Sequence, residues 1–260
     1  MPIRVLVAIL LSLSVSAAAE SSPGSGVSAL WAPAAATVLI VAVGLGLWGR
    51  LARHIRRMTD IESLFVWHGR AMALYAWLAI LVYAAVVFVG EWPEAVFAWL
   101  PPWRGTDLWL QQRLLILAPY LWLVLITWVI GYRMSSAVRR AAEIGWGGRR
   151  PQVRLGRYLV FQVRSQWLVF LVPYGFVLAC HNAAVVVWGG LSAEAETAAL
   201  AAPMILVYVL SPWLLRVAWS TSRLPDGPLR QRLEAAARRA GVYVRDIIVW
   251  RTGGLMVNAC

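Results

Sequence analysis

The chain has 260 residues, of which 61% are hydrophobic and 14% are charged. Soluble globular domains carry roughly 45–50% apolar and about 25% charged residues, so both departures indicate a chain that is solvated largely by lipid. The apolar content excludes intrinsic disorder, and having only two cysteines, Cys180 and Cys260, excludes a disulfide-rich scaffold.

The first 19 residues have the layout of a secretory signal peptide. Arg4 precedes an apolar stretch, Val5–Val15, which ends in the small residues 16–19 before Glu20. A short apolar stretch followed by small residues is typical of a leader that is removed after export. We therefore expect a signal peptide over residues 1–19, and a short uncleaved anchor is the alternative.

Five apolar runs then follow, each long enough to cross a bilayer as a helix. About 20 predominantly apolar residues are needed for the ~30 Å hydrocarbon core. The predicted spans are Leu30–Trp48, Ala71–Gly90, Leu114–Tyr132, Gln166–Gly189 and Ala199–Leu215. The last span reaches Leu215 if the Arg216 side chain extends to the headgroups. We predict an all-α polytopic membrane bundle over residues 20–219.

The basic residues lie on one side of these spans. All 24 are arginines, and all except Arg4, Arg104 and Arg113 fall into three segments, 50–70, 133–164 and 216–251. Cytoplasmic loops carry the excess of arginine and lysine. We therefore expect a bacterial-type inner or plasma membrane protein with its N-terminus outside and its C-terminus in the cytoplasm. This distribution explains the net charge of +12 without nucleic acid, and leaves the lipid bilayer as the expected partner.

One polar cluster, Cys180-His181-Asn182, lies in the middle of the fourth predicted span. Polar groups at membrane depth are costly and often functional. His181 is a candidate haem ligand, metal ligand or proton relay, and the competing interpretation is a hydrogen bond between helices that fixes the bundle. The second interpretation is preferred, because His54 and His68 lie in the first cytoplasmic loop and cannot reach the depth of His181.

A second polar group, residues 111–113, lies at the outer end of the third predicted span. Its two glutamines and its arginine are expected at the interface between lipid and water, since such side chains tolerate the headgroup region.

The composition changes after Trp219, and residues 220–260 predict a small soluble segment. Pro228 and Gly241 delimit a helix with one apolar face. The β-branched run Val242–Trp250 predicts a strand, and a Gly-Gly turn leads into a second strand, Leu255–Cys260. One helix and one hairpin cannot bury enough surface to be stable alone. Either they dock on the bundle or they begin a larger soluble domain, and the second alternative is preferred.

Residues 222–260 resemble the opening of the catalytic domain in integral-membrane zinc metallopeptidases of the family that includes HtpX and the CAAX prenyl protease. In that family, transmembrane helices lead into a cytoplasmic-side domain that begins helix, strand, strand, with an Asn-Ala step on the second strand. Asn258-Ala259 stands at the matching place. The resemblance implies an incomplete α+β zincin-like domain at 220–260, substrate binding by Asn258 and Ala259, membrane or misfolded proteins as substrates, and zinc as the family's cofactor.

The chemistry of that family requires a His-Glu-x-x-His helix, which supplies two zinc ligands and a general base. The sequence has no such motif, because His54, His68 and His181 are isolated. We therefore expect no catalytic residue, metal ligand or cofactor in this chain. By the resemblance, it is the membrane-anchoring N-terminal part of a zinc metalloendopeptidase, truncated before the catalytic motif. The alternatives are a self-contained multi-span transporter, anchor or assembly factor, and a haem or quinone redox bundle.

Overall fold

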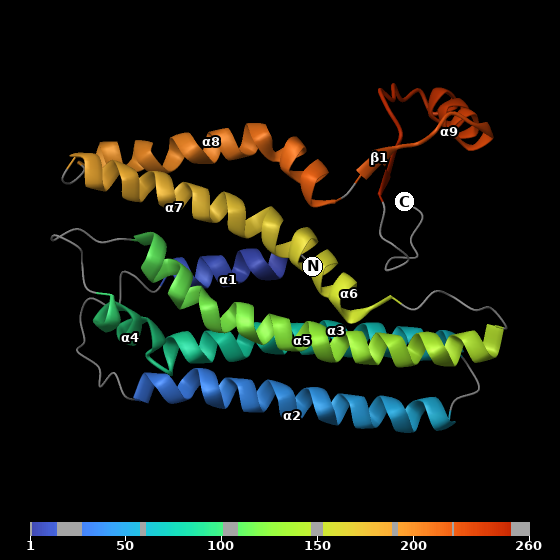
Figure 1. Cartoon of the computed structure of the whole chain (residues 1–260), viewed down its shortest axis with the longest axis horizontal. Coiled ribbons are helices and arrows are strands. Elements are labelled where there is room, and N and C mark those ends of the chain that lie inside the picture. The colour runs from blue at the N-terminus through green and yellow to red at the C-terminus, as the bar shows by residue number, and fades with distance from the viewer. Residues whose placement is uncertain are drawn as a thin grey trace.

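The structure is a computed structural model that describes residues 2–14, 28–57, 61–100, 109–146, 153–188, 192–219 and 221–250. Almost all of these residues are helical (Figure 1). In chain order the elements are α1 (Pro2–Ser14), α2 (Ser28–Arg57), α3 (Ile61–Phe88), α4 (Trp92–Trp99), α5 (Trp109–Trp146), α6 (Leu155–Gln162), the π-helical segment η3 (Val163–Leu168), α7 (Val169–Trp188), α8 (Ala193–Ala218), β1 (Thr221–Arg223), α9 (Pro228–Arg239) and β2 (Ile248–Trp250).

Five helical stretches among the described residues are long and apolar enough to cross a membrane, which confirms the five predicted spans. They are Trp31–Arg56, Glu62–Phe88, Leu110–Ala142, Leu155–Trp188 and Glu194–Ala218. Several are longer than predicted: α5 alone has 38 residues, or roughly 57 Å at the helical rise. Because this length exceeds the hydrocarbon core, the arginine-bearing turns extend beyond it.

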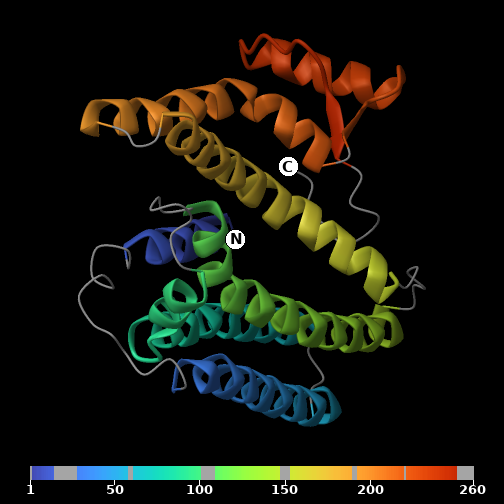
Figure 2. The same ribbon diagram turned by 60° about the vertical axis from the view of Figure 1, so that its left-hand side comes forward.

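The long helices lie side by side and alternate in direction (Figures 1 and 2). α2, α3 and α5 pack against one another, and α8 packs on α7, which contacts α5. The arginine-rich end of the bundle is the end at which α2 and α5 finish and the chain enters β1. At the other end, here called the α4 end, lie α4, the end of α7 and the start of α8.

The core of the bundle lies between α2, α3 and α5 and contains buried tyrosines. Tyr75 donates to the Ile40 carbonyl at 2.8 Å and Tyr83 to the Ile116 carbonyl at 3.3 Å. The rings of Tyr83 and Tyr120 lie 5.4 Å apart. The hydroxyls of Tyr75 and Tyr83 therefore each find an acceptor on a neighbouring helix, as a polar group away from water requires.

The segment predicted as a signal peptide forms a helix inside this bundle. α1 packs against α3, α5 and η3, and buries Val5, Ala8, Ile9 and Ser12. The small residues at the expected cleavage site lie outside the described residues, so removal of the leader stays a prediction. While it is present, α1 is a part of the helical core.

The tail contains the predicted helix but differs in its strands. α9 follows Gly227 as N-cap, and Gly241 adopts a φ of +68° just after the helix, where a residue without a Cβ is favoured. The predicted strand Val242–Trp250 is wrong over residues 242–247, because only Ile248–Trp250 is a strand. It pairs antiparallel with β1, Thr221 opposite Trp250, whereas the expected partner, Leu255–Cys260, lies outside the described residues.

Asp246 lies just before the shortened strand. Its carboxylate accepts a hydrogen bond from the Ile247 amide and forms ion pairs with Arg223 and Arg230. The Leu224 amide donates to the Ile247 carbonyl, and the next residue on that side, Pro225, has no N–H group with which to extend the pairing.

Two glycines of α2 provide a matched test of the bundle packing. A Cβ on Gly44 would lie 2.5 Å from both the Ile130 Cδ1 atom and the Tyr75 hydroxyl, whereas a Cβ on Gly46 would meet nothing within 4 Å. The Tyr75 hydroxyl cannot withdraw without losing its bond to Ile40. Gly44→Val should therefore lower the free energy of unfolding by about 1–3 kcal/mol.

The measurement is unfolding in mixed micelles, followed by tryptophan fluorescence. Gly46→Val, which adds the same side chain to the same helix, should change the free energy of unfolding by less than about 0.5 kcal/mol. Equal effects of the two substitutions would contradict the packing of α2 against α3 and α5.

Candidate functional site

Polar side chains from α5, α7 and α8 meet at the α4 end, around His181 and Asn182. Both residues are buried, with 2% and 8% of their surface exposed. The helical span starts at Leu155 and ends at Trp188, so His181 lies two turns before its end. Its predicted depth in the middle of the membrane stays a prediction.

Asn182 joins α7 to the beginning of α5. Its Oδ1 accepts from the Leu110 amide at 3.3 Å, and its Nδ2 donates to the Gln111 Oε1 at 3.3 Å. The first four amides of a helix have no partner within that helix, and α5 begins at Trp109. Asn182 therefore caps α5 from a neighbouring helix, whereas the hydrogen bond between helices was predicted for His181 and stays a prediction for that residue.

His181 faces α8. Its Nε2 lies 3.6 Å from the Glu196 Oε1, and the glutamate side chain is 41% exposed. Glu196 belongs to the first turn of α8, where Glu194 also lies and where Ser192 accepts a hydrogen bond from the Ala195 amide as N-cap. Carboxylates are favoured at this positive end of the helix dipole. The pair forms an ion pair when the imidazole is protonated.

A groove of about 810 Å³ lies between α7 and α8, and neither His181 nor Glu196 is among its lining residues. Small side chains dominate its lining, and its polar members among the described residues include Cys180 and Ser192. A groove with few polar groups suits an apolar occupant such as lipid.

A second polar centre joins α1, α5 and α7. Arg113 is 3% exposed, and its Nη1 donates to the Ser12 carbonyl at 2.8 Å. The Ser12 hydroxyl lies 3.4 Å from the Tyr174 hydroxyl. The expected interfacial position is wrong for Gln112 and Arg113, which are buried in the protein. The reason is α1, whose last carbonyls lack intrahelical donors and receive the guanidinium.

Two further side chains cap helix ends in the same manner. Gln112 donates to the carbonyl of Leu100, the C-cap residue of α4, at 3.0 Å. Arg164 donates to the Val217 carbonyl, in the last turn of α8, at 2.6 Å. Neither contact was expected from the sequence, because each depends on how two helices are aligned along their lengths.

The three histidines do not converge. His54 stacks on Trp67 with ring centroids 5.3 Å apart, and the His68 Nε2 lies 3.1 Å from the Ser135 hydroxyl. Both lie toward the arginine-rich end, whereas His181 lies at the α4 end. Among the described residues, no group of three His, Cys, Asp or Glu side chains could hold a metal ion.

The substrate-binding pair implied by the family resemblance, Asn258 and Ala259, lies outside the described residues. No family model matches the chain, and neither the curated proteins nor the solved structures contain a significant match. The hydrogen bonds of Asn182, Arg113, Gln112 and Arg164 cap helix ends and tie helices to one another.

The tie between α5 and α7 can be measured by a double-mutant cycle. Asn182→Ala should lower the free energy of unfolding more than Gln111→Ala, because it also leaves the Leu110 amide without its acceptor. We expect a coupling energy between the two side chains of about 0.6 kcal/mol, which is typical of hydrogen bonds in membranes. Unfolding in mixed micelles would measure it, and strictly additive effects would contradict the bond.

The contact between Arg113 and α1 is expected to be stronger, since the donor is charged and buried. Arg113→Ala should lower the free energy of unfolding by about 1.5–3 kcal/mol and speed amide exchange in α1. The exposed Arg50 provides the control, because Arg50→Ala should stay within about 0.5 kcal/mol. Unchanged exchange in α1 would refute the capping role.

Proposed function

We propose that this chain is the membrane-anchoring front part of a zinc metalloendopeptidase, of the integral-membrane family that includes HtpX and the CAAX prenyl protease. The proposal is supported by five membrane-length helices followed by a tail with the helix and strand of that family's domain opening. The observation that carries it is the tail, residues 221–250, which is locally ordered but has almost no interior.

Ion pairs hold the tail together. Arg230 contacts the Glu234 carboxylate at 2.9 Å and the Asp246 carboxylate at 3.3 Å, and donates to the Leu224 carbonyl at 2.9 Å. The hydrogen bond that Arg230 donates to Glu234, with the nearby acidic side chains, raises the pKa of Arg230. Arg223 adds a contact of 2.7 Å to Asp246. These contacts join β1, α9 and the approach to β2.

The apolar side chains of the tail remain uncovered. α9 contains no buried residue, and Leu229 and Leu233 on its apolar face are 59% and 43% exposed. Tyr243 is 92% exposed. A two-stranded ribbon with one helix is marginal in water unless another layer covers it. A soluble domain built on this surface would supply that layer, which favours the opening of a domain over a finished tail.

The proposed arrangement places the tail in the cytoplasm. It follows α8 at the arginine-rich end of the bundle, and the excess of arginine marks the cytoplasmic side. The mature N-terminus would then lie outside a bacterial-type inner or plasma membrane. Membrane or misfolded proteins are the proposed substrates, by resemblance to the family.

The residues of this chain do not fit the family's zinc site. His-Glu-x-x-His is absent from the sequence, and the described residues contain no group of three suitable ligands. The chain's own residues therefore supply no step of peptide hydrolysis. Its proposed contribution is to anchor and orient a catalytic domain at the membrane surface.

A self-contained membrane protein, such as a transporter, anchor or assembly factor, is the second candidate. The α7–α8 groove of about 810 Å³ favours it, because a lining dominated by small side chains suits a small apolar solute. Filling the groove by Ala199→Phe would then impair transport or binding, whereas the anchoring role needs no such effect.

The test of the proposal is the reading frame that follows the codon for Cys260. We expect it, directly or after a frameshift, to encode His-Glu-x-x-His within a few tens of codons. Several hundred bases without that motif in any frame would contradict the proposal.

The extended protein provides the biochemical arm of the same test. It should bind zinc and cleave an unfolded protein, and chelation should abolish cleavage. The control replaces the motif's glutamate by glutamine, which should keep zinc and lose cleavage. Cleavage by the 260-residue chain alone would contradict the proposal that the catalytic motif lies beyond Cys260.

A further inference from the structure

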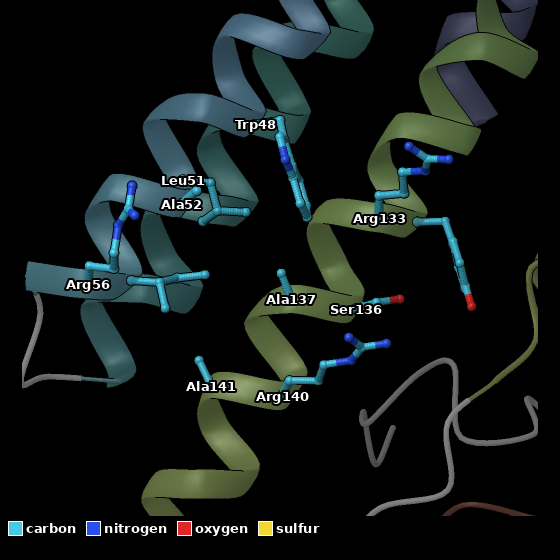
Figure 3. A pocket seen from close by; sticks show the side chains of 11 residues that line it. Trp48, Leu51, Ala52, Arg56, Arg133, Ser136, Ala137, Arg140 and Ala141 are labelled. Carbon is cyan, nitrogen blue, oxygen red and sulfur yellow. The ribbon is translucent and has the colours of Figure 1, made fainter.

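A continuous groove runs between α2 and α5 on the arginine-rich half of the bundle. One part has a volume of about 630 Å³ and a second part, nearer the bundle centre, about 430 Å³. Trp48 and Arg133 line both parts, so they form one surface, here called the α2–α5 groove. Figure 3 views its arginine-bearing part.

The part near the helix ends combines small side chains with arginines. Arg56, Arg133 and Arg140 are among the residues that line this part. In Figure 3, Ala137 and Ala141 of α5 face the space toward α2, Arg133 and Arg140 extend from the opposite side of α5, and Arg56 lies on α2. Arg133 and Arg140 are seven residues apart, so two helical turns place them on one side of α5. The small alanines leave the space between the helices open.

The charge of these arginines is not neutralised within the described protein. None of the ion pairs among the described residues includes Arg56, Arg133 or Arg140, whereas Arg223 and Arg230 in the tail are paired. Guanidinium groups match the geometry of phosphate oxygens and can bind them in a bidentate manner. The border of the groove is therefore complementary to an anion.

The inner part of the groove is apolar. Its lining includes Leu45 on α2 and Trp122, Ile126 and Val129 on α5, and Leu45 and Trp122 are 59% and 53% exposed. From Trp48 to Val41 the groove follows α2 for about 10 Å. A free phosphate would leave this length uncovered, and an uncharged lipid would leave the arginines of α5 without a partner.

Trp48 lies at the junction of the two parts. An indole ring prefers the headgroup depth of a bilayer, where its apolar ring and its N–H group are both accommodated. The junction thus coincides with the level at which the phosphate of a phospholipid meets its acyl chains.

We propose that the α2–α5 groove binds an anionic phospholipid, with its phosphate at Arg133 and Arg140 on one side of α5 and an acyl chain along the apolar part. Basic pockets between transmembrane helices on the arginine-rich side are suited to such headgroups. Binding there would join α2 to α5 from outside the core and hold the arginine-rich end at the membrane surface.

The test measures binding of phosphatidylglycerol and phosphatidylcholine to the purified chain in neutral detergent, by native mass spectrometry and by thermal unfolding. Phosphatidylglycerol should bind more tightly and raise Tm more. Arg133→Gln combined with Arg140→Gln should lower its affinity on the order of tenfold to thirtyfold, since each arginine near an anionic headgroup contributes about 1 kcal/mol.

The matched control combines Arg50→Gln with Arg53→Gln. It removes the same charge from exposed positions of α2 that do not line the groove, and should keep the preference for phosphatidylglycerol. Equal losses in the two double variants would overturn the proposal in favour of diffuse surface charge. The absence of any preference over phosphatidylcholine would overturn it as well.

Two further arms address shape and ligand source. Ala137→Phe fills the groove while keeping every arginine, so it should abolish the preference and leave the Tm without lipid unchanged; it decides the question if the double arginine variant does not fold. Retained preference for phosphatidylglycerol in Ala137→Phe would refute the groove as the site.

Inorganic phosphate should compete weakly with phosphatidylglycerol. Full competition at equal concentration would indicate a free-anion site and overturn the lipid assignment.

Discussion

Helix ends that lie inside the bundle must find hydrogen-bond partners within the protein, and this constraint organises the structure. Water is absent from the hydrocarbon core, so each backbone N–H or C=O group left without a hydrogen-bond partner there would cost several kcal/mol. Asn182 caps the start of α5, and Arg113 caps the end of α1. Gln112 caps the end of α4, and Arg164 makes an exposed contact of the same kind at the end of α8. Through these contacts, the short helices α1 and α4 are held in fixed positions relative to the long helices.

The two parts of the chain are stabilised by different forces. In the bundle, apolar side chains fill the space between α2, α3 and α5, and tyrosine hydroxyls reach backbone carbonyls of neighbouring helices. In the tail, the ordered contacts are ion pairs around Arg230, while Leu229 and Leu233 remain exposed. Exposed ion pairs contribute little to stability in water. The tail is therefore expected to be less stable than the bundle and to depend on whatever covers its apolar face.

The spans could be predicted because apolar runs of membrane length are visible without any knowledge of tertiary contacts. The α9 boundaries were likewise predictable, since Pro228 and Gly241 act through their own backbone preferences. The packing of α1 could not be foreseen, because the apolar stretch of a signal peptide and a short core helix have the same composition. The strand over residues 242–247 was wrong because a β-branched run does not show where its partner strand ends, and β1 ends at Arg223.

The candidate site was foreseen in its residues and not in its partners. His181 and Asn182 stood out as polar residues in an apolar run, but Glu196 and Leu110 meet them only through the alignment of three helices. Arg113 was assigned to the interface because its acceptor, the Ser12 carbonyl, belongs to a segment that was expected to leave the protein. Backbone acceptors carry no sequence signal, so contacts of this kind are the least predictable.

The bond between Arg113 and Ser12 also bears on the order of assembly. The two residues are 101 positions apart, so α1 is synthesised long before its partner on α5 emerges. Before that point α1 can already pack against α3, but its last carbonyls have no donor from α5. The insertion of α5 therefore completes the contacts of the N-terminal helix.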